Sequence, residues 1–211
     1  LFNGVDVLEL GLPSNATLAA GPARDPGRAK PLCFYGTSIV HGACATRAGM
    51  AYPAILGRRF DRPVLNFGFA GYAWSDLSIA RVLAELDPCV YVLDPLPNMD
   101  AAGVNKRMEP FVRLLRDAHP KTPIVLVEYL PATPIGGLIH ASHHRTREQN
   151  SAALRAVCDR LTASGLRDIH CFHTAGILGE DGEATVDGIH LTDLGFTRMA
   201  DALAPLLARL A

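Results

Sequence analysis

The chain has 211 residues, of which 49% are hydrophobic and 19% charged, and its 20 basic and 21 acidic residues give a net charge of −1. This balance argues against nucleic acid or an anionic membrane as the main partner, because both reward basic stripes. The longest apolar runs are strand-sized, far below the ~20 residues of a membrane span. The length predicts one domain with room for a short appendage.

The first 30 residues read as an extension of the main domain. An apolar run, Val5–Leu10, precedes a tract rich in proline, glycine and alanine, Gly11–Lys30, whose composition is typical of a linker. We therefore expect an extension over residues 1–30 and one domain over residues 31–211. The chain begins at Leu1 rather than at a methionine, which indicates a trimmed N-terminus.

From Pro31 onward, strand-like apolar runs alternate with amphipathic helical stretches. The runs lack strict polar alternation, as strands covered on both faces do. The predicted strands are Pro31–Tyr35, Pro63–Phe67, Cys89–Leu93, Ile124–Glu128 and Ile169–Phe172. The predicted helices are Tyr52–Phe60, Asp76–Leu86 after Ser75 as N-cap, one carrying Met108, Phe111, Val112 and Leu115 on one face, about His144–Ala163, and Asp193–Leu210 after Thr192 as N-cap.

This alternation predicts an α/β domain in which helices cover both faces of a five-stranded parallel sheet. Such sheets place their active sites at the carboxyl ends of the strands. Ser38, Gly71 and Asn98 all follow strand-like runs, and the His140 region follows the fourth one. We therefore expect them to converge on one edge of the sheet.

The segment Pro131–His143, rich in proline, glycine and histidine, predicts a flap over this edge. His140, His143 and His144 gather around it, but H-x-x-H-H on a loop lacks a fourth zinc ligand and a nearby cysteine, so we expect no metal there.

The five cysteines also predict neither a metal site nor disulfides. No two of them share C-x-x-C spacing, and Cys33, Cys89 and Cys171 lie in strand-like runs, where a thiol is usually a small buried apolar group. Unpaired cysteines favour a cytoplasmic location.

The sequence Phe34-Tyr35-Gly36-Thr37-Ser38-Ile39 places a serine at a strand-to-helix turn. There its hydroxyl is exposed and its backbone N–H points where an oxyanion would form. The alternative is that Thr37 or Ser38 serves only as an N-cap.

Two further blocks carry groups able to donate to an oxyanion. Gly71 follows a strand, where backbone without a side chain can approach a ligand, although a plain turn would look the same. Asn98 is held by Pro97 after another strand, and its amide is either a stiffly placed donor or part of a turn.

Near the C-terminus, Asp187-Gly188-Ile189-His190 puts a carboxylate three residues before a histidine. The aspartate can accept from the histidine Nδ1–H and leave Nε2 toward a serine. The alternative is an Asp-Gly turn beside a surface histidine.

Together these four blocks resemble the SGNH hydrolases, the GDSL-type esterases and lipases, over about residues 31–208. The resemblance implies a flavodoxin-like three-layer α/β/α fold. It makes Ser38 the nucleophile, His190 the base and Asp187 its orienter, with the Gly71 N–H and the Asn98 side chain as oxyanion donors. No metal or organic cofactor is implied.

The blocks depart from the family pattern in two places. Thr37 stands where GDSL proteins usually have aspartate, and the asparagine block reads Leu-Pro-Asn-Met. The latter looks like a subgroup with a β-sandwich domain before the hydrolase domain, and residues 3–10 look like the tail of that module. Gly71 closes its block as the family's glycine does, and Gly68 is the alternative.

The resulting hypothesis is a serine esterase that removes a small O-acyl group, expected to be acetyl, from a carbohydrate or glycoside. Tyr72 and Trp74 follow the oxyanion glycine and are expected to bind substrate, since tryptophan stacks on sugar rings, although Trp74 as a packing residue is the alternative. The partner is then an acyl ester or acylated sugar, and the oligomeric state stays open. The rival functions are acyl transfer to another acceptor, a decayed glycan-binding module, and a metal-dependent hydrolase.

Overall fold

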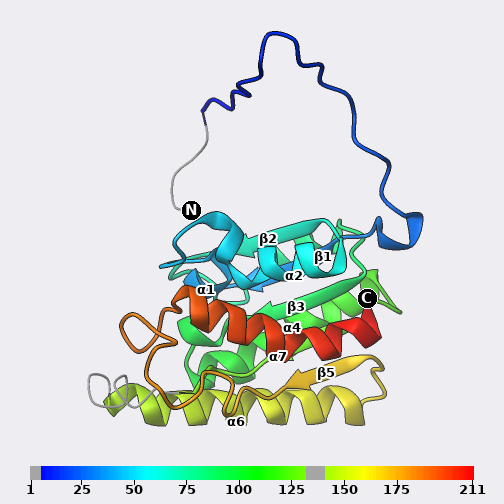
Figure 1. Ribbon diagram of the computed structural model, residues 1–211. Coiled ribbons are helices and arrows are strands. Elements are labelled where there is room, and N and C mark those ends of the chain that lie inside the picture. Colours follow the sequence, from blue (N-terminus) through cyan, green and yellow to red (C-terminus); the bar gives the residue numbers. More distant parts are fainter. Residues whose placement is uncertain (1–5, 132–140) are drawn as a thin grey trace.

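The computed structural model describes residues 6–131 and 141–211, and these form a five-stranded sheet, which can be followed in Figure 1. The strands are β1 (Leu32–Gly36), β2 (Val64–Gly68), β3 (Val90–Asp94), β4 (Ile124–Val127) and β5 (Ile169–Phe172). Their order is β2-β1-β3-β4-β5 and every pairing is parallel. This is the doubly wound order of flavodoxin-like folds, so the predicted fold class is confirmed.

Helices cover both faces of this sheet. The α-helices are α1 (Ser38–His41), α2 (Tyr52–Phe60), α3 (Leu77–Ala84), α4 (Ala101–Ala118), α6 (Ala141–Ala163) and α7 (Asp193–Leu210). Short 3-10 turns occupy η1 (Pro26–Arg28), η2 (Ala48–Met50) and η3 (Leu96–Asn98).

Alternate residues of β1 feed the two hydrophobic cores. Cys33 and Tyr35 pack with side chains of α3, α4 and α6, whereas Leu32 and Phe34 pack with side chains of α1, α2 and α7. All five residues of β1 are buried, as are all five of β3. Burial on both faces is why these strands show no polar alternation in the sequence.

Two N-cap predictions have opposite outcomes. Thr192 caps α7, with its Oγ1 accepting from the Gly195 N–H at 3.2 Å. The Ser75 prediction is wrong, because α3 begins at Leu77 and Asp76 occupies the N-cap position. Ser75 is instead buried, and its N–H donates to the Tyr35 hydroxyl at 2.8 Å. The Ser75 Oγ, the atom that would cap a helix, donates instead to Met108 Sδ at 3.1 Å in the core.

The cysteine prediction holds only in part. Cys33 is fully buried, but Cys89 and Cys171 are partly accessible. Cys171 lies on β5, the last strand at one edge of the sheet, where one side has no neighbouring strand to cover it.

Residues 6–30 are exposed throughout; the first part loops away from the domain in Figure 1, and the chain returns to it where Arg24 and Arg28 pair with Asp61. Val7 and Leu8 are among the exposed apolar side chains. The assignment of this stretch to a preceding β-sandwich module stays a prediction. Within the described residues, no helix combines the length and the apolar character needed to cross a membrane. The predicted flap, Pro131–His143, lies largely outside the described residues, as do the side chains of its histidines.

Candidate active site

Ser38 stands at a tight junction between β1 and α1. Thr37 is the N-cap of α1, with its Oγ1 accepting from the Ile39 N–H at 3.3 Å, and Ser38 is the first helical residue. A side chain at Gly36 would collide with Val40 and with the carbonyl of Asp94, so only glycine fits the end of β1. The capping role in the alternative interpretation thus belongs to Thr37, which leaves the Ser38 hydroxyl free for other contacts.

The structure brings Ser38, His190 and Asp187 into one hydrogen-bonded line. Ser38 Oγ lies 3.0 Å from His190 Nε2, and His190 Nδ1 lies 2.7 Å from Asp187 Oδ2. Because an ionised carboxylate only accepts, this contact fixes the proton on Nδ1 and turns the Nε2 lone pair toward the serine. This is the arrangement in which a histidine can take a proton from a serine hydroxyl.

The second oxygen of Asp187 is held by backbone. Its Oδ1 accepts from the His190 N–H at 2.7 Å and from the Ile189 N–H at 2.9 Å. Partial burial works to raise the pKa of Asp187, but the hydrogen bonds from the His190 ring and from these two N–H groups outweigh it and lower the pKa to about 2. Asp187 therefore stays ionised at any pH where the protein would work.

The loop carrying Asp187 and His190 is closed by backbone contacts. Thr185 and Leu191 form an antiparallel bridge, and the Val186 N–H donates to the His190 carbonyl at 2.8 Å. Gly188 turns the chain at φ +83°, in the left-handed region that favours glycine.

Gly71 and Asn98 lie in loops that follow the strands on either side of β1. β1 lies between β2 and β3, so the loop after β2, which carries Gly71, and the loop after β3, which carries Asn98, border the Ser38 turn. Both residues line a cavity of about 560 Å³, together with Trp74 and Arg107. The Ala73 N–H donates to Asn98 Oδ1 at 3.2 Å, which leaves the Asn98 NH₂ group as the donating end of the amide.

The two candidate glycines have different surroundings. Gly71 is exposed at φ +78° with open space around it. A side chain at Gly68 would overlap the backbone of His41, and the Gly68 carbonyl accepts from His41 Nδ1 at 2.9 Å. Gly68 thus allows α1 to pack closely on β2, and the geometry favours Gly71 as the residue with an N–H open to a ligand.

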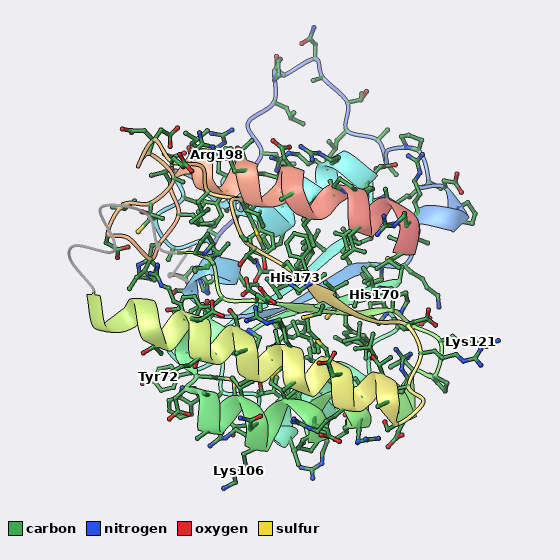
Figure 2. The ribbon with its side chains drawn as sticks, turned by 90° about the horizontal axis from the view of Figure 1, so that it is seen from below. Tyr72, Lys106, Lys121, His170, His173 and Arg198 are labelled. Atoms are coloured by element: carbon green, nitrogen blue, oxygen red, sulfur yellow. The ribbon has the colours of Figure 1, made fainter. Side chains whose placement is uncertain are left out.

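Trp74, which lines the cavity, forms an aromatic pair with Tyr72. Their ring centroids are 5.3 Å apart, and the two residues are 70% and 42% exposed. Figure 2 shows Tyr72 at the periphery of the molecule. Arg107 donates to the Trp74 carbonyl at 3.2 Å and pairs with Asp76, which fixes the backbone beneath the tryptophan. Both rings are therefore accessible to a ligand, and an exposure of 42% for Trp74 fits a partly buried packing residue as well.

Among the described residues, Glu128, Cys171 and His173 could together hold a metal ion, since their donor atoms lie within 4.8 Å of one another. His173, labelled in Figure 2, contacts Glu128 through Nδ1 at 2.8 Å. Arg155 donates to the same Glu128 oxygen at 2.9 Å. That guanidinium already neutralises the carboxylate and would repel a cation, so the cluster reads as an ion-pair network.

Sequence reasoning missed two buried polar residues near this edge. Asp94, the last residue of β3, accepts from the Tyr52 hydroxyl at 3.1 Å, and burial raises its pKa to about 8. Arg147 on α6 is 6% exposed and donates from Nη2 to the Gly188 carbonyl at 2.7 Å. The only sequence signal that Asp94 is buried was its position as a charged residue at the end of an apolar strand. Nothing in the local sequence indicates that Arg147 is buried.

A family model described as the GDSL-like lipase/acylhydrolase family matches residues 29–208. The chain has no match among curated protein sequences.

Several solved structures resemble the chain. A protein described as a GDSL-like lipase from Bacteroides ovatus is 31% identical with a TM-score of 0.81, over 86% of this chain and 53% of its own. The salicylyl-acyltransferase SsfX3 from a tetracycline biosynthetic pathway is 20% identical with a TM-score of 0.74, over 89% and 56%. A family two carbohydrate esterase from Clostridium thermocellum, in complex with cellohexaose, is 16% identical with a TM-score of 0.69, over 92% and 67%. The chain thus spans little more than half the length of the first two.

Proposed function

We propose that this chain, which belongs to the GDSL-like lipase/acylhydrolase family, is a serine esterase that removes a small acyl group from an alcohol oxygen. The observation that carries the proposal is the hydrogen-bonded line from Ser38 Oγ through His190 to Asp187. A serine, an imidazole and a carboxylate in this order form an activated nucleophile.

In the proposed reaction, Ser38 Oγ attacks the acyl carbonyl while His190 Nε2 takes the hydroxyl proton. The imidazolium formed is stabilised by Asp187, and it then gives the proton to the leaving alkoxide. An acyl group remains on Ser38. His190 next takes a proton from water, the resulting hydroxide attacks the acyl carbonyl, and Ser38 leaves with the proton.

The charge that develops on the carbonyl oxygen needs donors that are in place before the reaction. We assign this role to the N–H of Gly71 and the NH₂ of Asn98. Their support is that both line one cavity, that the loops bearing them border the Ser38 turn, and that Ala73 orients the Asn98 amide.

For the leaving group we propose a carbohydrate or glycoside, and for the acyl group an acetyl. The exposed pair Tyr72 and Trp74 supplies apolar faces of the kind on which sugar rings stack. Among the similar structures, one family two carbohydrate esterase holds cellohexaose. The second candidate is acyl transfer, because the same acyl-enzyme serves an alcohol or amine acceptor and one similar structure is a salicylyl-acyltransferase.

A panel of aryl acetates, longer aryl esters and acetylated sugars tests the proposal, with Ser38→Ala as the inactive variant. The matched control is Ser78→Ala, an exposed serine on α3. We expect hydrolysis and fluorophosphonate labelling by the parent chain and by Ser78→Ala, and neither by Ser38→Ala. Removal of such a nucleophile costs on the order of 10⁶ in kcat.

Adding alcohol or amine acceptors separates hydrolysis from transfer, since a transferase forms the new ester or amide faster than free acid. Activity lost to a chelator and restored by a metal ion would favour the metal-dependent alternative. Ester hydrolysis that survives in Ser38→Ala would remove the serine mechanism.

A further inference from the structure

Arg147 connects α6 to the loop that carries Asp187 and His190. Its Nη2 donates to the Gly188 carbonyl at 2.7 Å, across 41 residues of sequence. The Gly188 carbonyl and the Ile189 N–H belong to the same peptide group. That N–H donates to Asp187 Oδ1. Arg147 therefore binds the same short turn whose N–H groups donate to the Asp187 carboxylate.

The guanidinium of Arg147 packs against the ring of Tyr129. Its central carbon lies 5.3 Å from the centroid of the Tyr129 ring, a cation–π distance. Tyr129 is itself anchored, because its N–H donates to Ser151 Oγ at 3.2 Å and its carbonyl accepts from the Thr174 hydroxyl at 2.7 Å. The guanidinium that donates to the Gly188 carbonyl thus rests on a ring whose backbone is bonded to Ser151 of α6 and to Thr174 after β5.

Burying the Arg147 guanidinium costs free energy. Arg147 is 6% exposed, and its Nε and Nη1 atoms have no hydrogen-bond partner among the described residues. The salt bridges found in the described part of the chain do not include it. Within the described residues the guanidinium has no carboxylate partner and two of its nitrogens lack a hydrogen-bond partner, so its burial there costs free energy.

The catalytic loop has a reason to need an outside support. The Asp187 side chain is 45% exposed, so water can compete for the carboxylate that faces His190 Nδ1. The turn also contains Gly188, whose backbone has many alternatives to its left-handed conformation. A donor fixed in the core restricts that freedom.

We propose that Arg147 is a positioning residue, which holds the Gly188 carbonyl so that Asp187 stays aligned with His190. The inference rests on the proposed esterase function and adds to it a residue that touches neither substrate nor the reacting atoms. Its effect is on the geometry of the Asp187–His190 pair, and misplacement by about 1 Å can cost ~10²-fold in rate.

The test compares Arg147→Met and Arg147→Lys with Arg160→Met. Arg160 lies on the same helix, but it is exposed and pairs with Glu109 at 3.1 Å. We expect Arg147→Met to leave the chain folded, because the apolar side chain fills most of the same space, and to lower kcat by about 10- to 100-fold with little change in KM, because the Gly188 carbonyl loses its donor. Arg147→Lys should recover part of kcat, since an ammonium can still donate to the Gly188 carbonyl.

A second measurement does not depend on activity. The proton on His190 Nδ1, in its short bond to Asp187, should give a downfield proton NMR resonance that Arg160→Met retains and Arg147→Met shifts or loses by faster exchange with water. If the parent chain hydrolyses no ester, the proposed function fails, and this resonance still decides the role of Arg147. A resonance and kcat both unchanged in Arg147→Met, or a kcat loss matched by unfolding with the resonance intact in the folded fraction, would overturn the inference.

Discussion

Tyr52 donates its hydroxyl hydrogen to Asp94 over 3.1 Å, inside a core from which water is excluded. Tyr52 comes from α2 and Asp94 ends β3, next to the end of β1. Burial dominates the behaviour of this carboxyl and raises its pKa to about 8, against the smaller lowering effect of the Tyr52 bond. Asp94 therefore holds its proton at neutral pH, beneath the turn that presents Ser38.

This relationship predicts how stability depends on pH. A group whose pKa is higher in the folded chain than in the unfolded chain stabilises fully below the unfolded pKa, about 4, and that contribution is lost as pH rises toward 8. Asp94→Asn, which keeps an acceptor for Tyr52, should be more stable than the parent chain, by a margin that grows from pH 5 to pH 8. Urea unfolding at several pH values measures the margin. Parallel stability curves would mean that Asp94 is ionised in the folded state.

His190→Ala should lose nearly as much activity as Ser38→Ala, and Asp187→Asn somewhat less. The aspartate aligns and stabilises the imidazolium but makes no bond to substrate, and an asparagine in this position typically costs about 10⁴ in kcat. The control is Glu180→Gln, which removes the charge of an exposed carboxylate that precedes the Asp187–His190 loop. Steady-state kinetics on an aryl acetate gives all three values. Full activity in Asp187→Asn would send the search to another orienting group.

Asn98→Ala should lower kcat by about 10²–10³, roughly 3–4 kcal/mol, with little effect on KM, because the donor matters most once the carbonyl oxygen carries charge. Asn98→Asp supplies a sharper contrast, since it keeps the acceptor for the Ala73 N–H and removes the donor. Both kcat and melting temperature are measured on each variant. Reduced stability with unchanged kcat in Asn98→Ala would make Asn98 a turn former and take it out of the oxyanion site.

Gly71→Ala and Gly68→Ala should fail in different ways. The added methyl at Gly71 meets no atom, but φ +78° costs roughly 1–2 kcal/mol for a residue with a Cβ and tilts the N–H, so kcat should fall while the fold survives. At Gly68 the methyl would overlap the His41 backbone, so the melting temperature should fall steeply. Calorimetry with kinetics separates the two. An equal kcat for Gly71→Ala and the parent would argue that another N–H serves the oxyanion.

Trp74→Ala should raise KM for an acetylated sugar and leave small aryl acetates nearly unchanged. The indole borders the cavity and is partly exposed, so its removal takes away a stacking face without opening the core. Leu77→Ala, another exposed apolar side chain close by in sequence, serves as control. Similar KM changes for both classes of ester would return Trp74 to a packing role.

The sheet could be predicted from the sequence because its signals are local. Five apolar runs, each between stretches with helical periodicity, gave all five strands to within a residue or two. The contact between Asp187 and His190 is also local, since three residues separate them. Predicting the Ser38–His190 contact required knowing that both residues lie at the same edge of the sheet. The resemblance to a family supplied that information.

What could not be predicted depends on partners far away in the chain. Ser75 looks like an N-cap in the sequence, but its Oγ donates to Met108, 33 residues later, and its N–H donates to the Tyr35 hydroxyl, 40 residues earlier. Tyr52 and Asp94 are 42 residues apart, and Arg147 reaches Gly188 only because α6 packs beside the catalytic loop. A single polar residue in a helical stretch gives no sign of being buried, so such contacts come only from the folded chain.

The bond between Ser38 and His190 joins residues 152 positions apart, and α7, the last helix, begins three residues after His190. Ser38 can therefore be activated only once the segment after β5, which carries His190, has folded back against the end of β1. Closing so large a loop is among the slower events of folding. Reactivity of Ser38 thus reports that this long-range contact has formed.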